Sequence, residues 1–124
     1  EPIPGSEEVI PADAVLIVSP EHNRSMPAAV KNLLDIASRP AGKSLWGGKK
    51  TAVITASPGS YGGINSGLHI RQSLQAMSAD VMIAPEVFLS RAHTALADGQ
   101  VSDARTAAFL NKFAAAFYAW AQAE

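Results

Sequence analysis

The sequence predicts an α/β domain in which a parallel sheet carries helices on its faces. Three short apolar runs, at residues 14–18, 51–56 and 81–84, have the continuous hydrophobicity of strands covered on both faces. A segment with apolar residues at helical spacing follows each run. This alternation favours parallel pairing, because each helix returns the chain across one face of the sheet.

Composition limits the functions that the chain can have. Its 124 residues, of which 48% are hydrophobic, predict a single domain spanning 1–124. A formal net charge of −1 with scattered basic residues gives no reason to expect nucleic acid as a partner. The absence of cysteine excludes disulfides and thiolate chemistry. No apolar run is long enough to span a bilayer and the N-terminus does not read as a signal peptide, so we expect a cytoplasmic protein without membrane contact.

The first strand follows an extended, proline-rich lead-in at residues 1–12 and runs into a polar loop at 19–27. A helix is expected over 27–38, with Ser25 as its N-cap, and residues 39–42 end it. Its apolar face consists of Val30, Leu33, Leu34 and Ala37.

The second strand leads into a glycine-rich loop at 57–63 and then into a helix. The apolar face of that helix consists of Ile70, Leu74 and Met77. The third strand covers 81–84, with a continuation to Phe88 left open, and a turn follows at 97–100. A long amphipathic helix is expected from about Asp103. Its apolar stripe consists of Leu110, Phe113, Phe117 and Trp120, which we expect in the core or at a subunit interface.

The loop at 19–27 stands where open α/β sheets bind ligands, outside the carboxyl end of a strand. It offers carboxylate, imidazole, amide and hydroxyl groups, with the free N–H groups of a helix start. This set suits a planar, polar-edged cofactor better than a bare phosphate. The alternative is a solvated turn, in which Glu21 and Arg24 form a surface pair and Asn23 is a turn former.

The second loop is rich in glycine, which lets a backbone approach a ligand closely. Gly59, Gly62 and Gly63 are not followed by Lys-Ser or Lys-Thr, so the loop is not a phosphate-binding P-loop. The alternative is a tight strand-to-helix connection with no ligand. Since adjacent parallel strands bring both loops to the same rim, the two loops together favour a shared site.

The sequence gives little support for a metal site or for a catalytic nucleophile. His22, His69 and His93 stand apart from one another, so we expect no metal site. The G-x-S-x-G elbow of a catalytic serine is absent. Arg71 is expected to be structural, pairing with a carboxylate or with a partner chain.

The two loops carry a resemblance to a known family. Residues 20–27 read P-E-H-N-R-S-M-P, and Lys31-Asn32 and Asp35 follow at the family's spacing. Gly48-Lys49, a strand, and then S-P-G-S-Y-G-G at 57–63 form the second motif. On these residues the chain closely resembles the NADPH-dependent FMN reductase family over nearly its whole length.

The resemblance implies a flavodoxin-like fold, a doubly wound parallel sheet in three α/β/α layers. It also implies bound FMN and two-electron transfer from NADPH or NADH to quinones, azo compounds, metal oxyanions or free flavin. A homodimer or homotetramer is implied as well. Hydride chemistry belongs to the cofactor, so no catalytic protein acid or base is expected. The expected cofactor-binding residues are Pro20, Glu21, His22, Asn23, Arg24, Ser57, Gly59, Tyr61, Gly62 and Gly63.

Two departures from the family pattern bear on function. His22 stands where the family has tyrosine, which would alter stacking and could place a protonatable group beside the flavin ring that the resemblance implies. By the resemblance, the chain begins just before the family's third strand, and we expect it to lack the first two β-α units and the loop that grips the FMN phosphate. Three strands remain, and the first has an exposed apolar edge. We expect an N-terminal stretch, a separate chain or an exchanged segment to supply the missing half.

The alternative to a reductase is a protein without catalytic activity. In that case the chain is a flavodoxin-like fragment or subunit that has lost its cofactor and serves binding or assembly. A one-electron flavodoxin carrier is disfavoured, because its partners dock on acidic surfaces and this chain is close to neutral.

Overall fold

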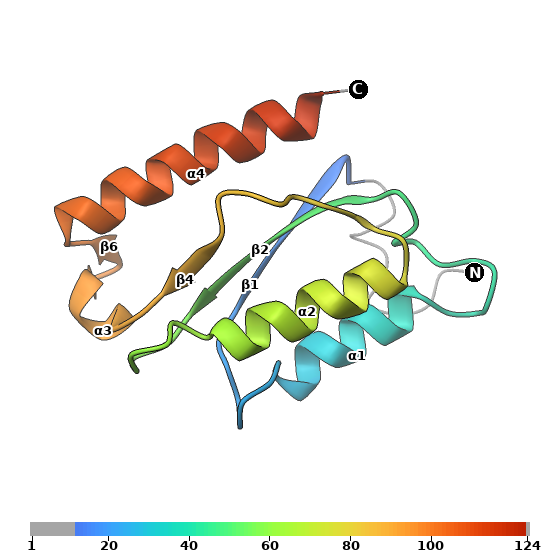
Figure 1. The fold of residues 1–124 in the computed structure, drawn as a ribbon, viewed down its shortest axis with the longest axis horizontal. Coiled ribbons are helices and arrows are strands. Elements are labelled where there is room, and N and C mark those ends of the chain that lie inside the picture. Colours follow the sequence, from blue (N-terminus) through green and yellow to red (C-terminus); the bar gives the residue numbers. More distant parts are fainter. Residues whose placement is uncertain (1–11, 124) are drawn as a thin grey trace.

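The computed structural model describes residues 12–123 and contains a four-stranded parallel sheet between two layers of helices. The lead-in expected at residues 1–12 lies almost wholly outside the described residues. Helices α1 and α2 lie side by side on one side of the sheet, and α4 lies on the other (Figure 1). The strands are β1 (Ala14–Ser19), β2 (Lys50–Ala56), β3 (Asp80–Val81) and β4 (Val87–Leu89), with a separate hairpin of β5 (Leu96–Ala97) and β6 (Gln100–Val101). The helices are α1 (Ala28–Ala37), α2 (Ile64–Ala76), α3 (Ala92–Ala95) and α4 (Ala104–Gln122).

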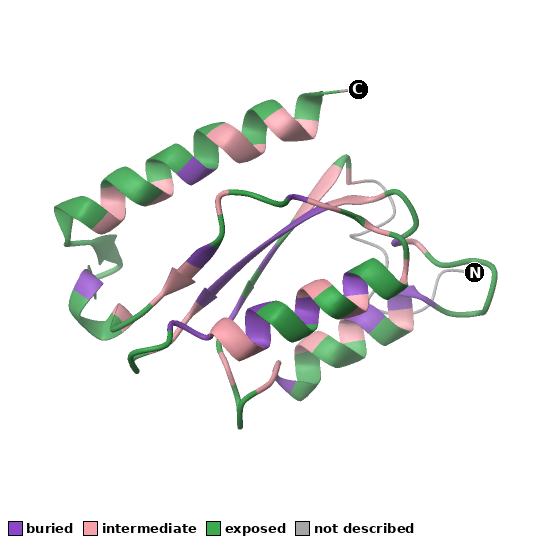
Figure 2. Cartoon of the chain, viewed as in Figure 1, coloured by how far each residue is buried: buried purple, intermediate pink, exposed green. Residues whose placement is uncertain are grey.

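Strand β2 is the centre of the sheet. It pairs in parallel with β1 along its length, in a register that runs from Ala14 opposite Lys50 to Ser19 opposite Thr55. Residues 51–55 are all buried, and Figure 2 shows β2 as the most continuously buried strand. The parallel sheet with helices on both faces is therefore confirmed.

The third strand differs from its prediction. In place of one strand at 81–84, two short strands, β3 and β4, pair with β2 on the same side. Pro85 lies between them and has no N–H to donate to a ladder. The pairing with β2 therefore stops before the proline and resumes at Val87. Phe88, to which the sequence left a continuation of the strand undecided, lies in the separate strand β4.

Strand β1 was expected to be covered on both faces, and this is wrong. Ile17 is buried beneath α1 and α2, whereas Leu16 is 39% and Val18 64% exposed. The reason is the position of β1 at the edge of the sheet, where no described element covers the face on the α4 side. An apolar groove of about 370 Å³ remains there, and Leu16, Ile54, Phe113 and Phe117 are among its lining residues.

Each face of the sheet has its own core. On the α1 and α2 side, Leu34, Ile70 and Leu74 are fully buried around Trp46, whose Nε1 donates to the Leu34 carbonyl at 3.1 Å. On the α4 side, Phe113 is 3% exposed and belongs to a cluster with Val87. The aromatic stripe of α4 was expected either in the core or at a subunit interface. It packs in the core.

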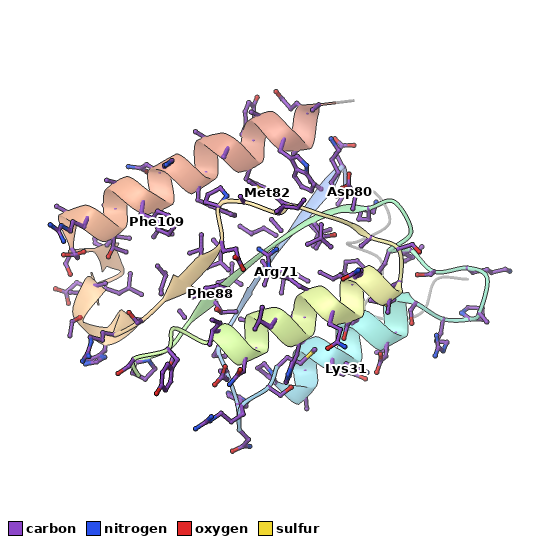
Figure 3. All side chains as sticks on the ribbon, viewed as in Figure 1. Lys31, Arg71, Asp80, Met82, Phe88 and Phe109 are labelled. Atoms are coloured by element: carbon purple, nitrogen blue, oxygen red, sulfur yellow. The ribbon has the colours of Figure 1, made fainter. Side chains whose placement is uncertain are left out.

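Several local expectations resolve differently. Ser25 does not cap α1, because Pro27 occupies the N-cap position and no side chain caps that helix. Arg71 pairs with a backbone carbonyl instead of a carboxylate: its Nη1 donates to the Met82 carbonyl at 3.0 Å, which joins α2 to the chain after β3 (Figure 3). His93 lies in the short helix α3.

Two other expectations are confirmed. The turn at 97–100 closes the β5–β6 hairpin, with Asp98 and Gly99 at positive φ. Asp103 begins α4 as its N-cap and accepts hydrogen bonds from the backbone N–H and the hydroxyl of Thr106, at 2.9 and 2.7 Å. Among residues 12–123, no helix has both the length and the hydropathy to cross a membrane.

Because the Thr106 hydroxyl and then the Thr106 backbone N–H stabilise the carboxylate, the pKa of Asp103 lies below its ordinary value. A group with a depressed folded pKa contributes stability above its unfolded pKa and loses it as the pH falls through the folded value. We therefore expect Asp103→Asn to lower the melting temperature at neutral pH, and the difference from the wild type to shrink in acid. Thermal melts across a pH series would measure this. Asp98→Asn, in an exposed turn, is the matched control, and an unchanging difference for Asp103→Asn would contradict the cap assignment.

Candidate functional site

Two loops meet at the carboxyl edge of the sheet. The first rim loop (20–27) leaves β1, and the second rim loop (57–63) leaves β2. Ser19 and Thr55, the partners at the end of the β1–β2 register, bring the two loops out side by side. The shared rim expected from the sequence therefore exists, and it contains every residue proposed for the cofactor site.

The first rim loop is built around a tight turn. His22 and Ser25 exchange two backbone hydrogen bonds, of 2.9 and 3.0 Å, and pair as an antiparallel bridge. Asn23 and Arg24 between them have φ values of 53° and 68°. Two successive left-handed residues inside such a pair are the signature of a type I′ turn. Asparagine suits this backbone, whereas for arginine it costs about 1 kcal/mol, so the turn depends on support from its surroundings.

That support comes from the first turns of α2. The Ser66 N–H donates to Glu21 Oε1 at 2.9 Å, and the Ser66 hydroxyl donates to the Pro20 carbonyl at 2.8 Å. Glu21 thus caps α2 from another loop and places a carboxylate at the positive end of the helix dipole. Further out, Ser25 Oγ and His69 Nδ1 lie 2.8 Å apart in a hydrogen bond.

The second rim loop is held by backbone contacts. The Thr55 hydroxyl donates to the Gly62 carbonyl at 2.8 Å, in a buried position. Gly62 and Gly63 have φ values of 64° and 78°, and Gly63 is the N-cap of α2. A Cβ at Gly62 would lie 2.6 Å from the carbonyl carbon and oxygen of Phe88 on β4. Gly62 therefore allows the loop to pass against β4, and Gly63 allows it to pass against Thr55 on β2, where a Cβ would lie 2.9 Å from Thr55 Cβ.

The front of the second rim loop is tied to the chain after β4. The Ser57 N–H donates to the Leu89 carbonyl, and the Arg91 N–H donates to the Gly59 carbonyl at 2.9 Å. Ser57 Oγ accepts from the Gly59 N–H at 3.1 Å. The loop is thus fixed at both ends while its tip stays open, and Tyr61 is 74% exposed there.

The expected site residues divide into two groups. Those that present surface at the rim are Pro20, His22, Asn23, Arg24, Gly59 and Tyr61. Those that hold the loops in place are Glu21, Ser57, Gly62 and Gly63. No described residues gather into a set of three or more metal-ligating side chains. Open backbone, an amide and a guanidinium beside a tight turn suit the polar edge of a flat ring.

Sequence reasoning missed Ser66 and His69. They lie three residues apart near the start of α2, so they share one face of the helix. That spacing, directly after the second rim loop, was the available signal. Nothing in the sequence showed that this face turns toward the first rim loop.

Comparisons with known proteins identify the family of the chain. The model of a family described as NADPH-dependent FMN reductase matches residues 5–94. The chain belongs to this family. The match ends within α3, so it includes both rim loops and all four strands of the sheet.

Individual proteins are also similar to the chain. A quinone reductase from Pseudomonas putida is 42% identical over 114 residues, which are 92% of this chain and 61% of that protein. A 2-hydroxy-1,4-benzoquinone reductase from a Burkholderia species is 37% identical, over 92% of this chain and 63% of that protein. Among solved structures, the flavoenzyme NAD(P)H:(acceptor) oxidoreductase FerB from Paracoccus denitrificans matches with a TM-score of 0.85 and 38% identity, covering 94% of this chain and 65% of that one.

These matches establish the flavodoxin-like fold of the family for this chain. They also show that the chain spans somewhat more than three fifths of the length of the relatives it matches.

We expect Gly62→Ala to disrupt the rim, because the new Cβ would meet the backbone of Phe88 and the left-handed backbone would be strained. The loss should reach about 3 kcal/mol of unfolding free energy, the range of severe packing defects. Gly59→Ala is the matched control, since its Cβ would lie at an ordinary 3.5 Å from Ser57 Oγ. Chemical denaturation of both variants measures the difference, and equal stability would show that the close approach to Phe88 is not required.

Proposed function

We propose that this chain forms the flavin-ring half of an FMN-dependent NAD(P)H oxidoreductase. The observation that carries the proposal is the pair of rim loops, both bearing the family motifs and both rigidly held at one edge of the sheet. In the proposed enzyme, two electrons pass from NADPH or NADH through FMN to a small-molecule acceptor.

The donor set fits the ring of the cofactor. The type I′ turn exposes Asn23 and Arg24, which would lie with Pro20, Glu21 and His22 along the polar pyrimidine edge. That edge has both donors and acceptors, and the backbone and side chains of the turn can match both. Fixed N–H groups and a positive guanidinium would favour the negative charge that reduction adds to the ring.

The second rim loop would flank the ring on its other side. Gly59 has no side chain, and only Ser57 Oγ would meet a Cβ there, so the front of the loop leaves space for a stacked nicotinamide. Ser57, Gly62 and Gly63 would hold this wall, while Tyr61 projects at its tip. When bound, FMN would supply the hydride chemistry, and the residues of the chain bind it, orient it and limit access to it.

The acceptor class follows from the relatives. Proteins named quinone reductases recur among them, which favours a quinone over azo compounds, metal oxyanions or free flavin. A cytoplasmic homodimer or homotetramer is part of the same proposal.

Phosphate binding requires more than the described residues. We propose that a strand and a helix from a further stretch of the same polypeptide add to β1, with the strand at the edge that no described strand pairs and the helix in the groove beside Phe113 and Phe117. The loop between them would reach the same rim as the other two, because it would follow a parallel strand. A separate chain or an exchanged segment would serve equally.

A non-catalytic flavodoxin-like subunit is the second candidate. The observation in its favour is that the described residues include no loop with the features of a phosphate grip. The visible spectrum of the intact purified protein separates the two candidates. The reductase should carry flavin absorbance that NADPH bleaches without oxygen, whereas a colourless protein that takes up no added FMN would support the non-catalytic subunit.

The turn itself can be tested with a pair of matched substitutions. Asn23→Pro removes an N–H and imposes a negative φ, so we expect FMN to bind at least about tenfold more weakly, a change of roughly 1.4 kcal/mol. Asp98→Pro makes the same change in the comparable turn of the β5–β6 hairpin and should leave FMN affinity unaltered. Fluorescence titration measures both. Equal affinities for the two variants would remove the first rim loop from the flavin site.

A further inference from the structure

One side-chain hydrogen bond ties the outer end of the first rim loop to α2. Ser25 Oγ and His69 Nδ1 are 2.8 Å apart, although 44 residues separate them in the chain. Ser25 ends the type I′ turn, and His69 lies on an exposed face of α2. The bond therefore joins the outer end of the turn to a helix that belongs to the core.

The helix is a firm support. Ser66, Ile70 and Leu74 are fully buried, so this face of α2 is fixed against the sheet. Ser66 holds the stem of the loop through its two bonds to Pro20 and Glu21. His69, one turn further along α2, bonds Ser25 at the far end of the turn, whereas Ser66 bonds Pro20 and Glu21, which precede it.

The turn transmits this restraint to the residues at its tip. Ser25 and His22 are joined by two backbone hydrogen bonds, so the position of Ser25 sets that of His22. Asn23 and Arg24 lie between them with left-handed backbones. A shift of Ser25 would therefore move the backbone groups that are proposed to meet the flavin ring.

We infer that His69 is a positioning residue for the first rim loop, acting through Ser25 on Asn23 and Arg24. The inference deepens the proposed function and rests on it for the identity of the ligand. What the interaction needs is a polar atom at the place of Nδ1. An asparagine can put an amide oxygen or nitrogen at that place, since its terminal atoms stand at the same distance along the side chain.

This equivalence supplies the test in the intact protein. His69→Ala should shift the backbone amide resonances of residues 22–25 in the flavin-free protein and weaken FMN binding about five- to tenfold, as expected for loss of one hydrogen bond. His69→Asn should restore both toward the wild type. His93→Ala, at an exposed histidine of α3, is the control and should change neither.

A second comparison isolates the pair. Ser25→Ala should reproduce the effect of His69→Ala, and the double variant should be no worse than either single one. Additive effects, unchanged loop resonances in His69→Ala, or no rescue by asparagine would each overturn the inference. If the resonances move and asparagine restores them while FMN affinity stays constant, the positioning role stands and the flavin assignment of the loop fails.

Discussion

The parallel pairing of β1 with β2 is the contact on which the candidate site depends. Six residue pairs set one register, and its last pair, Ser19 with Thr55, brings two polar loops out of the sheet next to each other. A slip of one residue would turn every side chain of β1 to the opposite face, which the burial of Ile17 against the α1 and α2 core opposes. The core thus fixes the geometry of the rim from a distance.

Helix α2 is the second organising element, because it serves both loops. Its N-cap, Gly63, belongs to the second rim loop, and its residue Ser66 holds the first. The two walls of the proposed flavin pocket are therefore both attached to α2. The distance between the walls follows from the way that helix packs. A flat cofactor needs such a fixed spacing more than it needs a catalytic side chain from the protein.

Sequence patterns were sufficient for elements that depend on local or one-dimensional features. The strand at 51–56, the turn at 97–100 and the start of the last helix at Asp103 follow from hydrophobic runs, turn chemistry and capping. Features that depend on distant neighbours were not accessible. Ser25 reads as a helix cap, yet its hydroxyl meets His69 across 44 residues. Likewise β1 reads as fully buried, since its sequence cannot show which of its faces the fold leaves uncovered.

The free edge of β1 has a consequence for the behaviour of this polypeptide in solution. Its outer N–H and C=O groups, which no strand within residues 12–123 pairs, are flanked by the exposed side chains of Leu16 and Val18 and are a template for an extended segment that reaches them. Where no strand covers that edge, pairing between two copies of the chain gains with concentration. The fraction of monomer is then expected to rise on dilution.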